Sequence, residues 1–169
     1  MTDYFSFFDL RPSPRVDQAA LKKAYYANSK QFHPDFHTLE DASTKDEVLE
    51  KSTLNNEAYR TLTDDDQRLR HLLELRGVLQ EEGKNEVPQS FLMEIMEVNE
   101  ALMELEFEDD PAVRLKVEGL IDQLEQDLEE EVTTIVEEYD DERVSPAELQ
   151  QLKDYYLKRR YLMRLREKI

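Results

Sequence analysis

The sequence predicts an all-α protein built from two helical units. Only three of its 169 residues are glycine, whereas Leu, Glu, Lys, Arg and Gln, which favour helices, are abundant. The few turn residues leave little support for hairpins, so almost no β-sheet is expected. Prolines fall where one helical pattern ends and another begins: Pro12, Pro14, Pro34, Pro88, Pro111 and Pro146.

The first unit is expected to span residues 1–76. Asp17 is a suitable N-cap for a helix. The apolar residues of this helix recur at helical spacing: Leu21, Ala24, Tyr25 and Phe32. Pro34 biases His33 away from helical backbone angles, so the helix should end there, before a polar loop.

Two further helices should complete this unit. One is expected from about 45 to 62, and either Asp64 or Asp65 caps the other, which carries three leucines before it stops at Gly77. Residues 77–88 hold two of the three glycines and several charged side chains. This segment is therefore interpreted as a short linker.

Residues 89–169 are predicted to form a three-helix bundle. Its helices are expected at about 89–107, 111–139 and 146–168. The last begins with Ser145, Pro146 and Glu148, a capping box with proline at the first helical position. The middle helix carries one apolar seam: Val113, Val117, Leu120, Leu124, Leu128, Val132, Ile135 and Tyr139.

Charge is distributed unevenly along the chain. The formal net charge is -18, and residues 81–142 carry 23 acidic and 3 basic side chains, whereas residues 143–169 carry 3 acidic and 8 basic ones. The basic last helix is therefore expected to lie antiparallel to the acidic middle helix. Such a negative chain has no general attraction for phosphate backbones or anionic lipid, so neither nucleic acid nor a membrane surface is an expected partner.

The sequence contains no cysteine. Disulfides, thiolate nucleophiles, Cys-ligated zinc and an iron-sulfur cluster held by the usual cysteines are thereby excluded. No apolar run approaches the roughly 20 residues that span a bilayer, and residues 1–10 lack the pattern of a signal peptide. A cytoplasmic protein without a cofactor is expected.

A first candidate site is the tripeptide His33-Pro34-Asp35 in the loop between the first two predicted helices. Three lysines lie on the helix before it: Lys22, Lys23 and Lys30. Together with Tyr4-Phe5 near the start and the run STLNNEAYRTL at 52–62, this pattern resembles the J domain, specifically that of HscB-type co-chaperones of iron-sulfur cluster assembly.

The resemblance implies that the loop and its preceding helix engage a DnaK/HscA-type chaperone and stimulate its ATP hydrolysis. His33, Pro34 and Asp35 would act in stimulation, and the three lysines would make electrostatic contacts. An exposed Asp35 carboxylate could be held by a partner arginine in a bidentate pair. Asp65 stands where the family often has proline, and the helix is only modestly basic, so a weak, salt-sensitive encounter is expected.

Two other interpretations of this loop remain open from the residues alone. The tripeptide could be a helix stop followed by a polar turn. Alternatively, His33, Asp35 and His37 could form an H-x-D-x-H metal site, since imidazole and carboxylate suit zinc or manganese. His71 lies in a leucine-rich helix and is expected to be a packed or surface histidine.

A second candidate site lies on the predicted helix at 89–107. Five apolar residues form its core stripe: Phe91, Ile95, Val98, Leu102 and Leu105. Three acids form a stripe on the opposite side, with Met93 among them: Glu97, Glu100 and Glu104. The flank between the two stripes holds further apolar residues: Leu92, Met96 and Met103. Such an acid-rimmed apolar surface either docks a basic partner or packs within the chain.

The run from Phe91 to Glu97 is similar to the segment by which HscB-type proteins hold the scaffold IscU. This resemblance implies a scaffold-binding set that includes one residue of the last helix: Leu92, Met93, Met96, Glu97, Glu100, Glu104 and Tyr161. Tyr161 departs from the phenylalanine often found there. Burial of three apolar side chains, offset by association entropy, predicts micromolar affinity.

The sequence therefore predicts a co-chaperone, not an enzyme, that delivers an iron-sulfur scaffold protein to a chaperone ATPase and assists cluster assembly and transfer. Two alternatives stay open. One is a J-domain co-chaperone for another client. The other is a metal-dependent hydrolase, which is disfavoured because no paired acid and base in an apolar pocket is identifiable.

Overall fold

A computed structural model describes all 169 residues and contains eight α-helices, one short 3-10 helix and no strand. The all-α prediction is confirmed. Contacts divide the chain into two compact units, one made of residues 1–76 with 139–143 and the other of residues 77–138 with 144–169. None of the helices combines the length and the apolar character that crossing a membrane requires.

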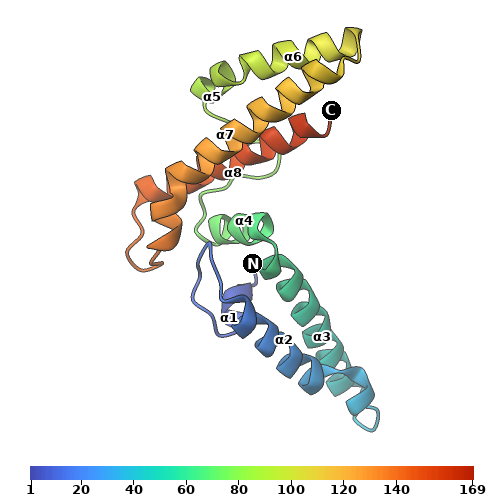
Figure 1. Cartoon of the computed structure of the whole chain (residues 1–169). Coiled ribbons are helices and arrows are strands. Elements are labelled where there is room, and N and C mark those ends of the chain that lie inside the picture. Colours follow the sequence, from blue (N-terminus) through green and yellow to red (C-terminus); the bar gives the residue numbers. More distant parts are fainter. The chain divides into compact units, whose positions relative to one another are not determined.

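The first unit is organised around a pair of long helices that run side by side in opposite directions (Figure 1). Its elements are α1 (Tyr4–Phe7), α2 (Gln18–Phe32), the 3-10 helix η1 (Pro34–Phe36), α3 (Ala42–Thr63) and α4 (Asp65–Leu75). Its core is formed by buried residues from all four α-helices: Phe5, Phe8, Leu21, Ala58, Leu62 and Leu72. The connection between α2 and α3, with η1 in it, lies at one end of the pair.

Aspartate caps set the helix starts in this unit. The Asp17 carboxylate accepts hydrogen bonds from two backbone N–H groups of the first turn of α2, and the Asp64 carboxylate accepts one from the Gln67 backbone N–H in the first turn of α4. The prediction that α3 begins near residue 45 was wrong by three residues, because Asp41 caps it. The Thr44 backbone N–H donates to Asp41 at 2.7 Å, which lowers the pKa of that carboxyl.

Two buried polar side chains tie the amino-terminal segment to α4. The Arg68 guanidinium donates to the backbone oxygens of Pro14 and Leu62, both at 2.8 Å. His71 is 5% exposed, as the packed histidine that the sequence predicted, and its Nε2 atom accepts a hydrogen bond from the Tyr4 backbone N–H at 3.1 Å. These bonds satisfy backbone groups that would otherwise be buried without partners.

The second unit is a helical bundle that presents the second candidate site. Its helices are α5 (Gln89–Glu94), α6 (Met96–Phe107), α7 (Pro111–Glu137) and α8 (Pro146–Arg166). The single helix predicted at 89–107 is interrupted at Ile95, where the backbone adopts φ −90° and ψ 4°. The apolar spacing continues across this break and keeps both Phe91 and Ile95 fully buried, so periodicity could not reveal it.

Helices α7 and α8 pack antiparallel, as the charge distribution predicted. Arg166 near the end of α8 contacts Asp122 and Glu125 of α7 at 2.6 and 3.1 Å, and Arg159 contacts Glu129 at 3.4 Å. These pairs are largely exposed, so each contributes only about 0–1 kcal/mol. The predicted capping box is present, with Ser145 and Glu148 exchanging hydrogen bonds at the start of α8.

Candidate functional site

The first site is the loop that joins α2 to α3. Pro34 is the first residue of η1, and the His33 ring accepts a hydrogen bond from the Asp35 backbone N–H at 3.2 Å. These local constraints fix the backbone of the turn. The Asp35 side chain is 84% exposed and that of His33 is 52% exposed. The carboxylate of Asp35 is therefore presented to solvent on an ordered turn, where another protein can reach it.

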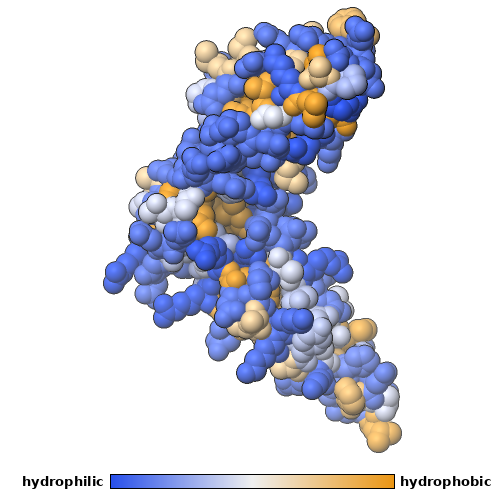
Figure 2. Space-filling model, viewed as in Figure 1, coloured by the Kyte–Doolittle hydropathy of each residue, from blue (hydrophilic) through white to orange (hydrophobic).

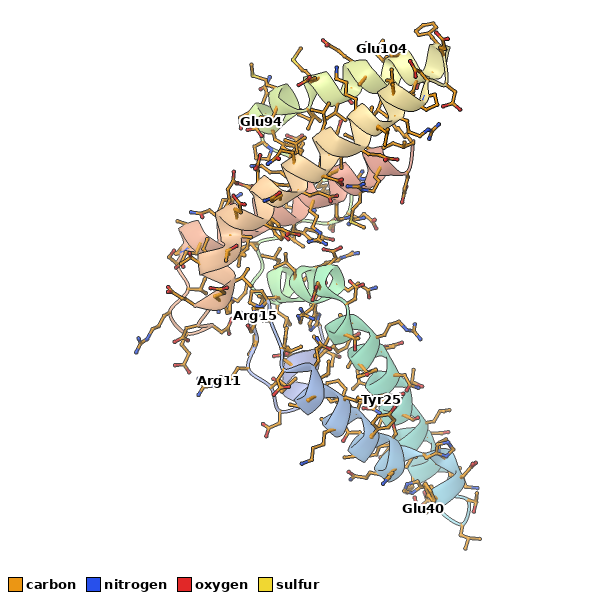
Figure 3. The ribbon with its side chains drawn as sticks, viewed as in Figure 1. Arg11, Arg15, Tyr25, Glu40, Glu94 and Glu104 are labelled. Atoms are coloured by element: carbon orange, nitrogen blue, oxygen red, sulfur yellow. The ribbon has the colours of Figure 1, made fainter.

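His37 fastens this loop to the end of α2. Its Nε2 atom lies 2.8 Å from the Gln31 carbonyl oxygen, and its Nδ1 atom lies 2.9 Å from the carboxylate of Glu40. The Gln31 carbonyl, and after it Glu40, raise the pKa of His37 because both accept hydrogen bonds from the protonated ring. Glu40 lies in the connection between the two helices (Figure 3).

The metal-site interpretation of the loop is not supported by this geometry. Both ring nitrogens of His37 face oxygen acceptors of the protein, so neither is directed at a shared position with His33 and Asp35. No group of three or more His, Asp or Glu side chains in the chain is placed to hold a metal ion. The loop is instead an ordered turn with its charged side chains exposed to solvent.

The lysines predicted to contact a chaperone share one exposed face of α2. At about 100° per residue, Lys22, Lys23 and Lys30 fall on the side of the helix opposite the buried Leu21. Tyr26 lies among them, is 54% exposed, and has the Lys22 ammonium 6.0 Å from its ring centroid. The sequence analysis missed Tyr26, although the same helical spacing places it on this face.

The opposite face of α2 is held firmly against α3. The rings of Tyr25 and Tyr59 stack with centroids 4.1 Å apart, and the buried Asn55 side chain donates to the Tyr25 carbonyl oxygen at 3.2 Å. Tyr25 also donates through its hydroxyl to Asn56 at 2.9 Å. The lysine face is therefore displayed by a helix whose position is fixed by specific contacts.

The second site is the outward surface of α5 and α6. Leu92, Met93 and Met96 are 39%, 69% and 56% exposed, although Phe91 and Ile95 on the same segment are buried in the bundle core. The three acids predicted with them are also exposed: Glu97, Glu100 and Glu104. Figure 3 shows Glu94 on α5 and Glu104 near the C-terminal end of α6. The helices of this unit therefore leave these side chains uncovered, which does not support the alternative that they pack in the bundle core.

Two further details of this surface concern its methionines and Tyr161. Met96 and Met103, which the sequence placed on the flank between the core and the acidic stripe, are 56% and 59% exposed. Tyr161 is half-buried, and its ring packs edge-on against Phe91 with centroids 6.0 Å apart. Tyr161 thus supports α5 from α8 as well as bordering the site.

Comparison with known families gives two matches, one in each part of the chain. Residues 3–71 match the model described as the DnaJ domain, and residues 87–169 match the model described as the HSCB C-terminal oligomerisation domain. The two matches together cover both candidate sites.

Similar proteins carry names that agree with these matches. The chain is 34% identical over 168 residues to the human iron-sulfur cluster co-chaperone protein HscB. The aligned region covers 99% of this chain and 67% of the human protein. It is 38% identical over 127 residues to the co-chaperone protein HscB homolog of Pseudoalteromonas atlantica, covering 75% and 71% of the two chains.

Solved structures of such proteins share the fold. The crystal structure of human HscB aligns with a TM-score of 0.75 and 31% identity, over 99% of this chain and 80% of the human one. Chaperone HscB from Vibrio cholerae aligns with a TM-score of 0.76 over 98% and 94% of the two chains. At 23% identity, the Vibrio structure supports the fold alone.

Proposed function

Because this chain belongs to the HscB family of J-domain co-chaperones, we propose that it binds an IscU-type iron-sulfur scaffold protein and delivers it to a DnaK/HscA-type chaperone ATPase, whose ATP hydrolysis it stimulates. The observation that carries this proposal is the exposure of both sites. Asp35 projects from an ordered turn of the first unit, and an apolar surface lies open on the second.

The chaperone contact rests on charge and shape in the first unit. The exposed Asp35 carboxylate can accept two parallel hydrogen bonds from a chaperone arginine, a geometry that fixes the orientation of the partner. The lysine face of α2, with Tyr26 in it, offers a positive surface to an acidic region of the chaperone. The lysines accelerate and orient the encounter, while Asp35 makes the contact that stimulates hydrolysis.

The scaffold contact rests on burial of apolar surface in the second unit. Leu92, Met93 and Met96 each gain roughly 1.5–3 kcal/mol when they are fully covered, but the loss of translational and rotational freedom offsets much of this sum. The neighbouring glutamates favour a partner with basic residues around its apolar patch. Because these two contributions largely offset each other, we expect the scaffold to bind this surface with micromolar affinity.

Delivery then works by tethering. A scaffold held on one unit, while the other unit engages the chaperone, is present near the chaperone at a high effective concentration. The chain itself supplies no covalent chemistry in this scheme. Its contribution to cluster assembly and transfer is to bring two other proteins together.

A steady-state ATPase assay of the chaperone, with and without this chain and the scaffold, tests the proposal. The chain should stimulate hydrolysis, and chain and scaffold together should stimulate it more than either alone. Asp35→Ala should remove stimulation yet keep scaffold binding, whereas the matched exposed variant Asp46→Ala should behave as wild type. Full stimulation by folded Asp35→Ala would contradict the assignment of the loop.

A further inference from the structure

Two exposed apolar residues of α6 belong to neither set of site residues assigned above. Met103 is 59% exposed and Phe107 is 89% exposed. At about 100° per residue, Met96, Met103 and Phe107 fall within about 40° of one another around the helix axis. The buried residues of α6, Val98, Ala101 and Leu102, lie on the other side. Exposed apolar residues thus recur along the outward side of α5 and α6, with Glu100 between Met96 and Met103, and together they form the apolar stripe: Leu92, Met93, Met96, Met103 and Phe107.

Folding of the bundle does not explain this stripe. The core is already filled by fully buried side chains from all four helices of the unit, among them Phe91, Val98, Val117 and Leu162. The stripe residues remain open to solvent, and the view in Figure 2 shows apolar side chains among hydrophilic ones over the region of α5 and α6. Contiguous exposed apolar surface of this kind marks an interaction site.

The length of the stripe bears on what it binds. Leu92, Met93 and Met96 span little more than one helical turn, whereas Met96 to Phe107 alone covers about 16 Å of α6 at 1.5 Å per residue. A specific protein interface buries about 800 Å² on each partner, more than three side chains supply. Resting on the function proposed above, we infer that the scaffold-docking surface extends along the whole stripe, with Met103 and Phe107 as additional binding residues.

The negative charge around the stripe restricts the kind of partner that can bind there. Residues 89–113 contain eight acidic side chains and no lysine or arginine, and Glu100 and Glu104 lie beside the stripe. A second copy of this chain that paired its own stripe with this one would bring two such acidic surfaces together, and their repulsion disfavours that symmetric pairing. The stripe therefore fits a partner whose apolar patch is bordered by basic residues, and the scaffold protein is assigned as that partner.

Calorimetric titration of the scaffold into the full chain tests this assignment. The double variant Met103→Ser/Phe107→Ser should raise the scaffold dissociation constant about 10- to 100-fold, since two apolar contacts are lost. The matched variant Leu49→Ser/Met163→Ser also replaces two exposed apolar residues, one on α3 and one on α8, and should bind as wild type. Met103→Leu/Phe107→Leu retains apolar surface and should retain most of the affinity.

A parallel titration of Leu92→Ser/Met93→Ser/Met96→Ser separates this inference from the function on which it rests. Loss of binding by the triple variant, with wild-type affinity of the double variant, would overturn the extension and leave the proposed function standing. Wild-type binding by the triple variant would overturn the scaffold-binding function itself. Sedimentation velocity adds one more outcome, because dissociation of a dimer by Phe107→Ser at unchanged scaffold affinity would assign the stripe to self-association instead.

Discussion

The Nε2 atom of His37 lies 2.8 Å from the carbonyl oxygen of Gln31, one of the last carbonyls of α2. The carbonyls of a helix end lack partners within the helix, so this contact satisfies a group that the helix leaves open. Since Glu40 contacts the other ring nitrogen at 2.9 Å, a protonated His37 donates one hydrogen bond to the Gln31 carbonyl of α2 and one to the Glu40 carboxylate in the loop. The turn that presents Asp35 is thereby fastened to α2 by a titratable side chain.

His37 should consequently titrate above 6.5, the ordinary value, because both of its partners favour the charged ring and raise its pKa. The stability that these bonds add is fully present below pH 6.5 and is lost as the pH rises through the raised pKa of the folded state. Histidine NMR signals, followed from pH 5 to 9, measure the pKa directly. A His37 pKa at or below 6.5 would show that the two contacts do not persist in solution.

His71 should behave in the opposite way in the same titration. Burial lowers its pKa, and its Nε2 atom serves as an acceptor for the Tyr4 N–H group, which requires a neutral ring. Below pH 6.5 the unfolded chain takes up a proton that the folded unit resists, so stability falls as the pH drops from 6.5 to the lowered pKa. His71→Gln keeps an acceptor and should flatten this dependence in chemical unfolding experiments at pH 7 and 5.5. An equally steep dependence in the variant would assign it to other groups.

Capping and proline signals allowed the sequence to predict several helix ends in the first unit. Asp17 and Pro34 bound α2 as predicted, because a cap and a helix-ending proline act within a few residues of the chain. α1 and η1 were not predicted, since elements of four and three residues are too short to show a period. Asp65, which departs from the family pattern, pairs with the buried Arg68, a contact that depends on packing with the distant Pro14.

For the candidate sites, local pattern left alternatives open. The resemblance to HscB-type proteins gave Asp35 and the Leu92 region their predicted roles, and the structure shows that both are exposed. Phe107 was missed because it sits at a helix end, where a helical wheel does not say whether the following turn covers the side chain. Ile121, fully buried in α7, was left out of the predicted seam because the neighbouring Leu120 fits the same spacing.

Neutralisation of the lysine face of α2 should weaken binding to the chaperone without affecting the fold. Exposed ion pairs contribute roughly 0–1 kcal/mol each, so Lys22→Gln/Lys23→Gln/Lys30→Gln should lower the affinity about tenfold at low salt. Screening removes this advantage, and the variant and wild type should converge as salt approaches 1 M. Surface plasmon resonance over a salt series measures both effects. Lys153→Gln, a single change on α8, serves as the control. A triple variant that binds the chaperone with wild-type affinity at low salt would show that the lysine face of α2 does not contact the chaperone.

Arg68→Ala should be among the most destabilising single substitutions of a charged residue in the first unit. The guanidinium is 4% exposed and satisfies the carbonyls of Pro14 and Leu62, so its removal leaves two buried acceptors without donors. Each unsatisfied group costs about 1–3 kcal/mol, whereas the exposed Arg60→Ala should change the free energy of unfolding by no more than about 0.5 kcal/mol. Guanidinium chloride unfolding of both variants compares them. Equal losses would mean that solvent replaces the arginine at these carbonyls, and the segment before α2 would then be held by its apolar contacts and by the hydrogen bond from Tyr4 to His71.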